Sequence, residues 1–112
     1  MNLGFIGTGN IVSDVIIGIS KSKIKYKKII ISPRNKKKAL YLKKYFKKVI
    51  IAKNNQEVIN KVDWVFLGVL PRVGEEILPK LQFRNKQIIV SFMSTTNHQK
   101  LKKLIRTKSI II

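Results

Sequence analysis

The residues best suited to chemistry form a glycine turn near the start of the chain, Gly7-Thr8-Gly9-Asn10-Ile11-Val12. Gly7 permits a tight turn, and Gly9 has no side chain to keep a large anion away from the backbone. An apolar segment precedes the turn and an amphipathic one follows it, so the turn should open a helix. The free amides and positive dipole end of that helix would then face the phosphates of a dinucleotide.

The last position of this motif departs from the usual pattern, because it holds Val12 where glycine or alanine is common. The larger side chain should hold the helix and the strand slightly further apart. An ordinary glycine-rich turn is therefore the alternative to a dinucleotide site.

The end of the second expected strand bears on which dinucleotide is bound. Domains that bind NAD usually place a carboxylate here for the ribose hydroxyls, and residues 31–35 contain none. Ser32, Arg34 and Asn35 can instead donate hydrogen bonds to a 2′-phosphate, and the planar guanidinium of Arg34 matches phosphate geometry. The lysines at 36–38 add positive potential. These residues predict NADP rather than NAD; the alternative is a capped helix with a surface arginine.

The elements that must position these residues follow from the hydrophobic pattern. Short apolar runs alternate with amphipathic stretches, which is typical of an α/β domain with a parallel sheet. We expect a Rossmann-like, doubly wound, mainly parallel sheet with helices on both faces, forming one NADP-binding domain over residues 1–112. The expected strands cover residues 2–6, 28–32, 49–52, 64–69, 87–91 and 109–112. The expected helices cover residues 10–20, 35–46 with Asn35 as the cap, 54–60, 73–81 and 97–105.

Apolar spacing predicts which face of each helix packs on the sheet. The inward residues are Ile11, Val15 and Ile19 in the first helix, Ala39, Leu42 and Phe46 in the second, and Val73, Ile77 and Leu81 in the fourth. The lysines of the second helix should face solvent, namely Lys36, Lys37, Lys43, Lys44 and Lys47.

Composition narrows the class of protein. The chain has no cysteine, one histidine and five acidic residues, so we expect no disulfide and no metal site. No uncharged apolar run is long enough to span a bilayer, and glycines interrupt any signal-peptide pattern at the N-terminus. We therefore expect a cytoplasmic protein without a membrane partner.

The formal net charge of +19 invites a nucleic-acid interpretation, because Lys and Arg neutralise phosphates in non-specific binding. Twenty of the 24 cations are lysine, however, and bidentate recognition favours arginine. A basic, solvated surface accounts for the charge equally simply. We expect no specific nucleic-acid partner.

Four segments together resemble the N-terminal domain of pyrroline-5-carboxylate reductases. They are residues 4–10 (GFIGTGN), residues 32–35 (SPRN), residues 65–72 (VFLGVLPR, similar to the family's VFLAVKPQ) and Ser91-Phe92-Met93-Ser94, where the family has Ser-Ile-Ala-Ala. The motifs occur in the family's order and spacing, and the resemblance covers essentially the whole chain.

The resemblance implies reduction of 1-pyrroline-5-carboxylate to proline by hydride from NADPH, the last step of proline biosynthesis. It implies that Gly7, Thr8, Gly9, Asn10 and Ile11 hold the pyrophosphate and that Ser32, Arg34 and Asn35 hold the 2′-phosphate. It further implies that Val69, Leu70 and Pro71 line the path from adenosine to nicotinamide, with Ser91 and Met93 near the nicotinamide.

The chain also departs from the family. Leu70 replaces a lysine, Thr95 stands where a glycine is usual, and the C-terminal helical domain for substrate binding and dimerisation is missing from residues 1–112. No general acid is evident, since His98 at a helix start fits a surface or capping residue better than a proton donor. Three interpretations stay open: the cofactor half of such a reductase, an NADP-binding domain without catalysis, and another reductase of the superfamily. A homo-oligomer is possible, and a substrate would need the missing domain.

Overall fold

The computed structural model describes residues 1–93, 95–105 and 110–112. The expectations for Ser94, in the fifth-strand motif, and for Ser109, at the start of the sixth strand, lie outside the described residues. Among the residues that are described, no helix is both long and apolar enough to cross a lipid bilayer.

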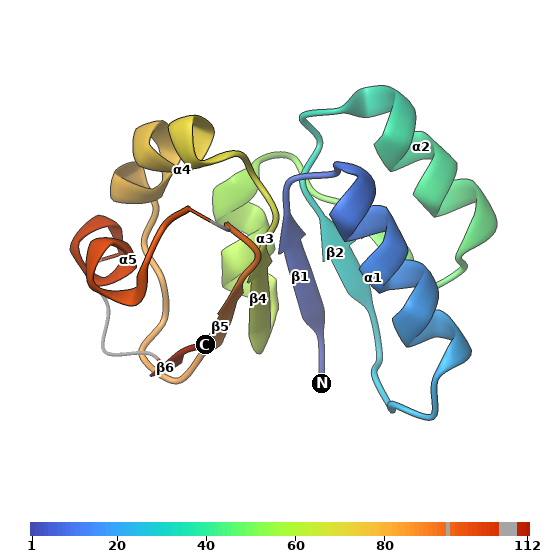
Figure 1. Ribbon diagram of the computed structural model, residues 1–112. Coiled ribbons are helices and arrows are strands. Elements are labelled where there is room, and N and C mark those ends of the chain that lie inside the picture. The colour runs from blue at the N-terminus through green and yellow to red at the C-terminus, as the bar shows by residue number, and fades with distance from the viewer. Residues whose placement is uncertain (94, 106–109) are drawn as a thin grey trace.

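The described strands form one parallel sheet in the order β3-β2-β1-β4-β5-β6 (Figure 1). The strands are β1 (Leu3–Ile6), β2 (Ile29–Ile31), β3 (Val49–Ile51), β4 (Trp64–Leu67), β5 (Ile88–Ser91) and β6 (Ile110–Ile111). The helices are α1 (Asn10–Lys21), α2 (Lys36–Tyr45), α3 (Asn55–Lys61), α4 (Pro71–Ile77), which continues into the 3₁₀ turn η1 (Leu78–Lys80), and α5 (His98–Leu104). The expected Rossmann-like α/β fold is confirmed, with strands slightly shorter than predicted.

Each face of the sheet has its own core. On one face α1 and α2 pack over β1, β2 and β3 through a cluster that includes Val12, Ile16, Ala39 and Leu42. On the other face α3, η1 and α5 pack over the sheet through Val58, Leu78 and Leu101. Ala39 and Leu42 confirm the predicted buried stripe of α2, and Phe46 packs half-buried beside them. Covering both faces explains why strands such as β2 consist of isoleucine alone.

The predicted buried face of α1 is wrong by one residue. Val12 and Ile16 are fully buried, whereas Ile11 is 56% exposed and Val15 and Ile19 are half-buried. The apolar side of the helix is broad and lies opposite Ser13 and Asp14, so four-residue spacing alone does not define which part of that side faces the sheet. The sheet selects the 12/16 stripe and leaves Ile11 at the edge where the glycine turn lies.

The fourth helix also differs from its prediction, because it begins at Pro71 and ends at Ile77 rather than running from 73 to 81. Pro71 occupies the first helical position, where a missing amide costs nothing. Pro79 then lies in the following 3₁₀ turn and prevents the α-helix from continuing. As a result Gly74 and Leu78 are buried, and the predicted inward residues Val73, Ile77 and Leu81 are half-buried.

Gly68, directly after β4, makes room for Val12. A Cβ atom built at Gly68 would lie 2.3 Å from Cγ2 of Val12, far inside van der Waals contact. The small and large members of this pair are thus complementary: the bulky residue on α1 occupies the space that a side chain at position 68 would need. The sheet end and α1 stay packed because Gly68 absorbs the extra volume of Val12.

This complementarity predicts a rescue. Gly68→Ala should destabilise the domain by about 1–3 kcal/mol through overpacking, and adding Val12→Ala should recover most of that loss. Urea denaturation of both variants and of Val12→Ala alone gives the coupling energy. Gly18→Ala is the matched control, since a Cβ atom there meets nothing within 4 Å. Strictly additive effects of the two substitutions would contradict the proposed contact.

Candidate functional site

The carboxyl ends of β1, β2 and β4 bring three loops together at one edge of the sheet. β1 lies between β2 and β4, so the chain leaves β1 toward α1 on one face and returns to β4 from α3 on the other. Ligands of doubly wound sheets bind in the crevice where the strand order reverses in this way. The glycine turn and the Gly68 loop lie at this point.

The glycine turn is defined by two different requirements. Gly7 has a φ of 99°, and a Cβ atom there would lie 2.5 Å from the carbonyl oxygen of Gly68. The protein itself therefore requires glycine at position 7. Gly9 is different, because a Cβ atom there would meet nothing within 4 Å. Its open surroundings leave the backbone of the turn accessible to a ligand.

Ser32 anchors this turn to β2. Its side chain is buried, with 1% exposure, and its Oγ accepts a hydrogen bond of 2.9 Å from the backbone amide of Gly7. The turn thereby gains a partner for a buried amide that the strand ladder does not satisfy. Ser32 was predicted to contact a ligand, and the structure places its oxygen on the turn instead of in the lining of a described cavity.

Thr8 provides a contrasting hydroxyl in the same turn. The residue is 3% exposed, and its Oγ1 has no hydrogen-bond partner in the described structure. A buried hydroxyl without a partner costs free energy. Because Thr8 also lines the cavity beside the turn, a bound ligand could provide the missing partner.

Helix α1 presents its amino end to this cavity. Gly9 is its N-cap in an extended conformation, and no side chain caps the helix, so its first amides remain available. On the neighbouring helix, Lys38 donates from Nζ to Oδ1 of Asn10. Asn35 caps α2 as predicted, accepting from the Lys38 amide at 3.2 Å, which leaves its side-chain amide free to donate.

The central cavity beside the glycine turn has a volume of about 530 Å³. It joins the turn, the start of α2 and the loop after β4, and its lining contains no acidic residue. The lining residues are Gly7, Thr8, Gly9, Arg34, Asn35, Lys36, Gly68, Val69, Leu70 and Val73.

A second cavity, of about 260 Å³, continues from it past Gly9 toward the end of β5. We call it the Met93 cavity. Its lining is uncharged and mostly apolar, and it includes Ile11, the residue that α1 leaves exposed. The lining residues are Gly9, Asn10, Ile11, Gly68, Val69, Leu70, Pro71, Phe92 and Met93.

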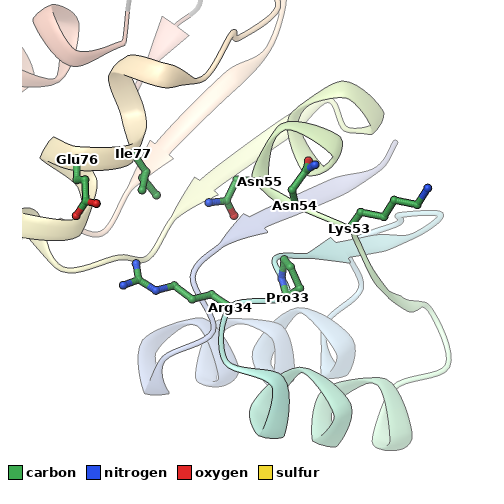
Figure 2. Close-up of a pocket in the computed structure, with 7 residues that line it drawn as sticks. All are labelled: Pro33, Arg34, Lys53, Asn54, Asn55, Glu76 and Ile77. Atoms are coloured by element: carbon green, nitrogen blue, oxygen red, sulfur yellow. The ribbon is translucent and has the colours of Figure 1, made fainter.

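A third cavity, of about 340 Å³, lies beyond Arg34 on the β3 side; we call it the Asn55 cavity. Its lining residues are Pro33, Arg34, Lys53, Asn54, Asn55, Glu76 and Ile77. Figure 2 shows the Arg34 side chain reaching across this space toward α4, while Lys53 points away from it. Arg34 is exposed, and no described side chain forms an ion pair with it. It lines both this cavity and the central one, so its charge serves both.

Most of the predicted site residues meet along this crevice. Ser32 and Ser91 are the two predicted residues that line none of the described cavities; Ser91 Oγ instead accepts from the Met93 amide at 3.1 Å. Sequence reasoning did not assign Gly68, Val73, Phe92 or the Asn55 cavity to the site. A signal for the Asn55 cavity was available in the sequence, because Asn54 and Asn55 follow β3 after two intervening residues, at the same carboxyl edge.

A comparison with protein families shows the family of this chain. Residues 2–95 match the family described as NADP oxidoreductase, coenzyme F420-dependent. The chain belongs to this family. No match was found among the curated proteins.

Solved structures of pyrroline-carboxylate reductases share the fold of this NADP oxidoreductase domain. The 1-pyrroline-5-carboxylate reductase of Streptococcus pyogenes is 27% identical with a TM-score of 0.78. Those of Coxiella burnetii (22% identical, TM-score 0.84) and Plasmodium falciparum with NADP bound (20%, TM-score 0.78) show the same fold. The matches cover 94%, 98% and 94% of this chain but 38%, 42% and 38% of those chains. This chain therefore spans less than half the length of these structures.

The two buried hydroxyls of the site predict opposite effects on stability. Ser32→Ala leaves the Gly7 amide without a partner and should lower the free energy of unfolding by about 1–3 kcal/mol. Thr8→Val, which removes a hydroxyl that has no partner, should leave the stability unchanged or raise it. Urea denaturation without ligand measures both. Equal destabilisation by the two substitutions would refute the assigned anchoring role of Ser32.

Proposed function

We propose that this chain binds NADPH along the carboxyl edge of its sheet, as the cofactor half of a reductase. The observation that carries the proposal is the combination of an open glycine turn at the start of α1 with an exposed, unpaired Arg34 in the adjoining cavity. The turn offers amides to a pyrophosphate, and Arg34 offers a planar fork to a further phosphate. The family match supports the same cofactor.

The preference for NADPH over NADH rests on charge. The central cavity contains Arg34 and Lys36 and no carboxylate, so a 2′-phosphate meets only positive charge there. Ser32 is buried and does not line the central cavity, which leaves Arg34 and the side-chain amide of Asn35 as the donors best placed for that phosphate. Glu76 lines the neighbouring Asn55 cavity, so we place the adenine rather than the phosphate on that side.

The reaction we propose is reduction of a cyclic imine such as 1-pyrroline-5-carboxylate, which would give L-proline. The likeness to the S. pyogenes enzyme supports it, as do the segments around Gly7, Arg34 and Val69. Bound NADPH supplies a hydride to the imine carbon, and the imine nitrogen takes a proton. The residues of the Met93 cavity would hold the nicotinamide in apolar, uncharged surroundings that exclude water from the transferred hydride.

A second candidate is an NADP-binding domain without catalysis of its own. It is favoured by the lining of the Met93 cavity, where Asn10 is the one polar side chain and no ionisable group could donate the proton. A substrate pocket and a proton source would then have to come from a further domain, which the longer similar structures have room for.

Cofactor preference is tested by calorimetry. NADPH should bind more tightly than NADH. Arg34→Ala should lower the affinity for NADPH by at least about tenfold, the equivalent of one charge-assisted contact, and should leave the affinity for NADH nearly unchanged. Arg72→Ala is the matched control, because Arg72 is exposed and lines none of the described cavities. Equal affinities of the parent chain for the two nucleotides would reject the assignment.

Activity is tested separately. Residues 1–112 with NADPH should give no detectable reduction of 1-pyrroline-5-carboxylate, because the Met93 cavity has no proton donor. The decrease in NADPH absorbance measures the reaction. A second assay offers oxidised coenzyme F420, the coenzyme named in the family description, as the hydride acceptor in place of the imine. Turnover of either compound by this chain would show that a second domain is not required.

A further inference from the structure

Positive charge is concentrated in one part of this chain. Fourteen of the 24 Lys and Arg residues lie between Val15 and Gln56, and none of the five acidic residues does. This stretch builds most of α1, the whole of α2 and the two strands β2 and β3. The proposed nucleotide would use only Arg34 and its immediate neighbours, so it leaves most of this charge without a role.

The outer side of α2 carries both cations and exposed rings. We call this side the α2 surface. Leu40, Tyr41 and Tyr45 are 52%, 53% and 61% exposed, which is unusual for large side chains on a helix whose other face is in the core. The α2 surface consists of Lys36, Lys37, Leu40, Tyr41, Lys43, Lys44 and Tyr45, all exposed.

The two tyrosines form a pair at the edge of a groove. Their ring centroids lie 4.7 Å apart with the planes tilted by 47°, and Lys44 Nζ lies 5.7 Å from the Tyr45 ring centroid. Tyr41 also lines an open groove of about 690 Å³ between α1 and α2. The groove is lined by Asn10, Ser13, Asp14, Ile17, Lys37, Lys38 and Tyr41, so it holds a single carboxylate.

From this arrangement we infer that the α2 surface binds single-stranded nucleic acid without sequence preference. Lysines spaced along the helix neutralise successive phosphates, and the exposed rings of Tyr41 and Tyr45 offer faces on which unpaired bases stack. Bases of a duplex are already stacked on each other and do not reach such rings. The helix has no arginine for bidentate contacts to base edges, so binding is independent of sequence.

The chemistry of the surface favours a nucleic acid over an anionic lipid bilayer. A membrane-binding helix buries a continuous apolar face in the lipid. The apolar face of α2 is instead occupied by the sheet, since Ala39 and Leu42 are in the core. The α2 surface carries one leucine and two tyrosines among four lysines. This composition suits the stacking of bases and the neutralisation of phosphates better than insertion into a bilayer.

The test is fluorescence anisotropy with a short fluorescein-labelled oligothymidylate, at several salt concentrations and with and without saturating NADPH. Tyr41→Ala/Tyr45→Ala should weaken binding by about tenfold or more, and Tyr41→Phe/Tyr45→Phe should not. Lys43→Gln/Lys44→Gln should reduce the slope of log affinity against log salt by about 1.4, two phosphate contacts on a single strand. Lys102→Gln/Lys103→Gln, which removes equal charge from exposed positions of α5, should leave the slope unchanged.

Several outcomes would overturn the inference. Equal slopes for the α2 and α5 lysine variants would show that net charge alone attracts the oligonucleotide. Full affinity of the tyrosine-to-alanine variant would remove the stacking role. Displacement by NADPH would place the oligonucleotide in the nucleotide site rather than on α2, and tighter, tyrosine-dependent binding to phosphatidylserine vesicles would make the partner a membrane. Displacement by NADPH would itself show that NADPH binds, and the other results do not bear on NADPH binding, so the two proposals fail independently.

Discussion

The close contact between two backbone segments, at Gly7 and Gly68, is the constraint on which the site depends. The turn after β1 and the loop after β4 approach until no Cβ atom fits at position 7. The strand ladder continues across them, since the Gly68 amide donates to the Ile6 carbonyl at 2.8 Å. The crevice beside these two loops includes Gly7, Gly9 and Gly68 in its lining, so part of its surface is backbone that a pyrophosphate can approach.

Two compensations keep this contact intact. Val12 is larger than the residue usual at its position, and Gly68 provides the space for it. Ser32 holds the turn from the β2 side through the Gly7 amide. A side chain that sequence reasoning assigned to the ligand thus contributes mainly by fixing the backbone that would contact the ligand. Such indirect roles are invisible in a motif, because the motif records residue types and not the direction of their hydrogen bonds.

The fold itself was largely predictable from the sequence, for physical reasons. Uninterrupted isoleucines in β2 require burial on both faces, and Asn35 and Asn54 cap the helices that follow them. The rotation of α1 was not predicted to the residue, because its apolar side is broad enough to include both Ile11 and the buried pair Val12 and Ile16. Nor was the end of α4, where Pro71 and Pro79 set the boundaries and move the buried positions to Gly74 and Leu78. The cavity linings depend on these helix rotations and ends. They were therefore predicted less accurately from the sequence than the helices and strands were.

The two halves of the carboxyl edge differ in their electrostatics, and this difference matches the two ends of a dinucleotide. Beside β2 the crevice is positive, with Arg34 and Lys36, and would balance phosphate charge. Beside β5 it is uncharged, and Ile11, Leu70 and Met93 form an apolar wall. Hydride transfer changes the charge of a nicotinamide, and the lining of the Met93 cavity contains no charged group that could balance this change. The proposed nucleotide site thus offers positive charge for the phosphates and an uncharged wall for the nicotinamide, and the lining of the Met93 cavity holds no ionisable group for proton transfer.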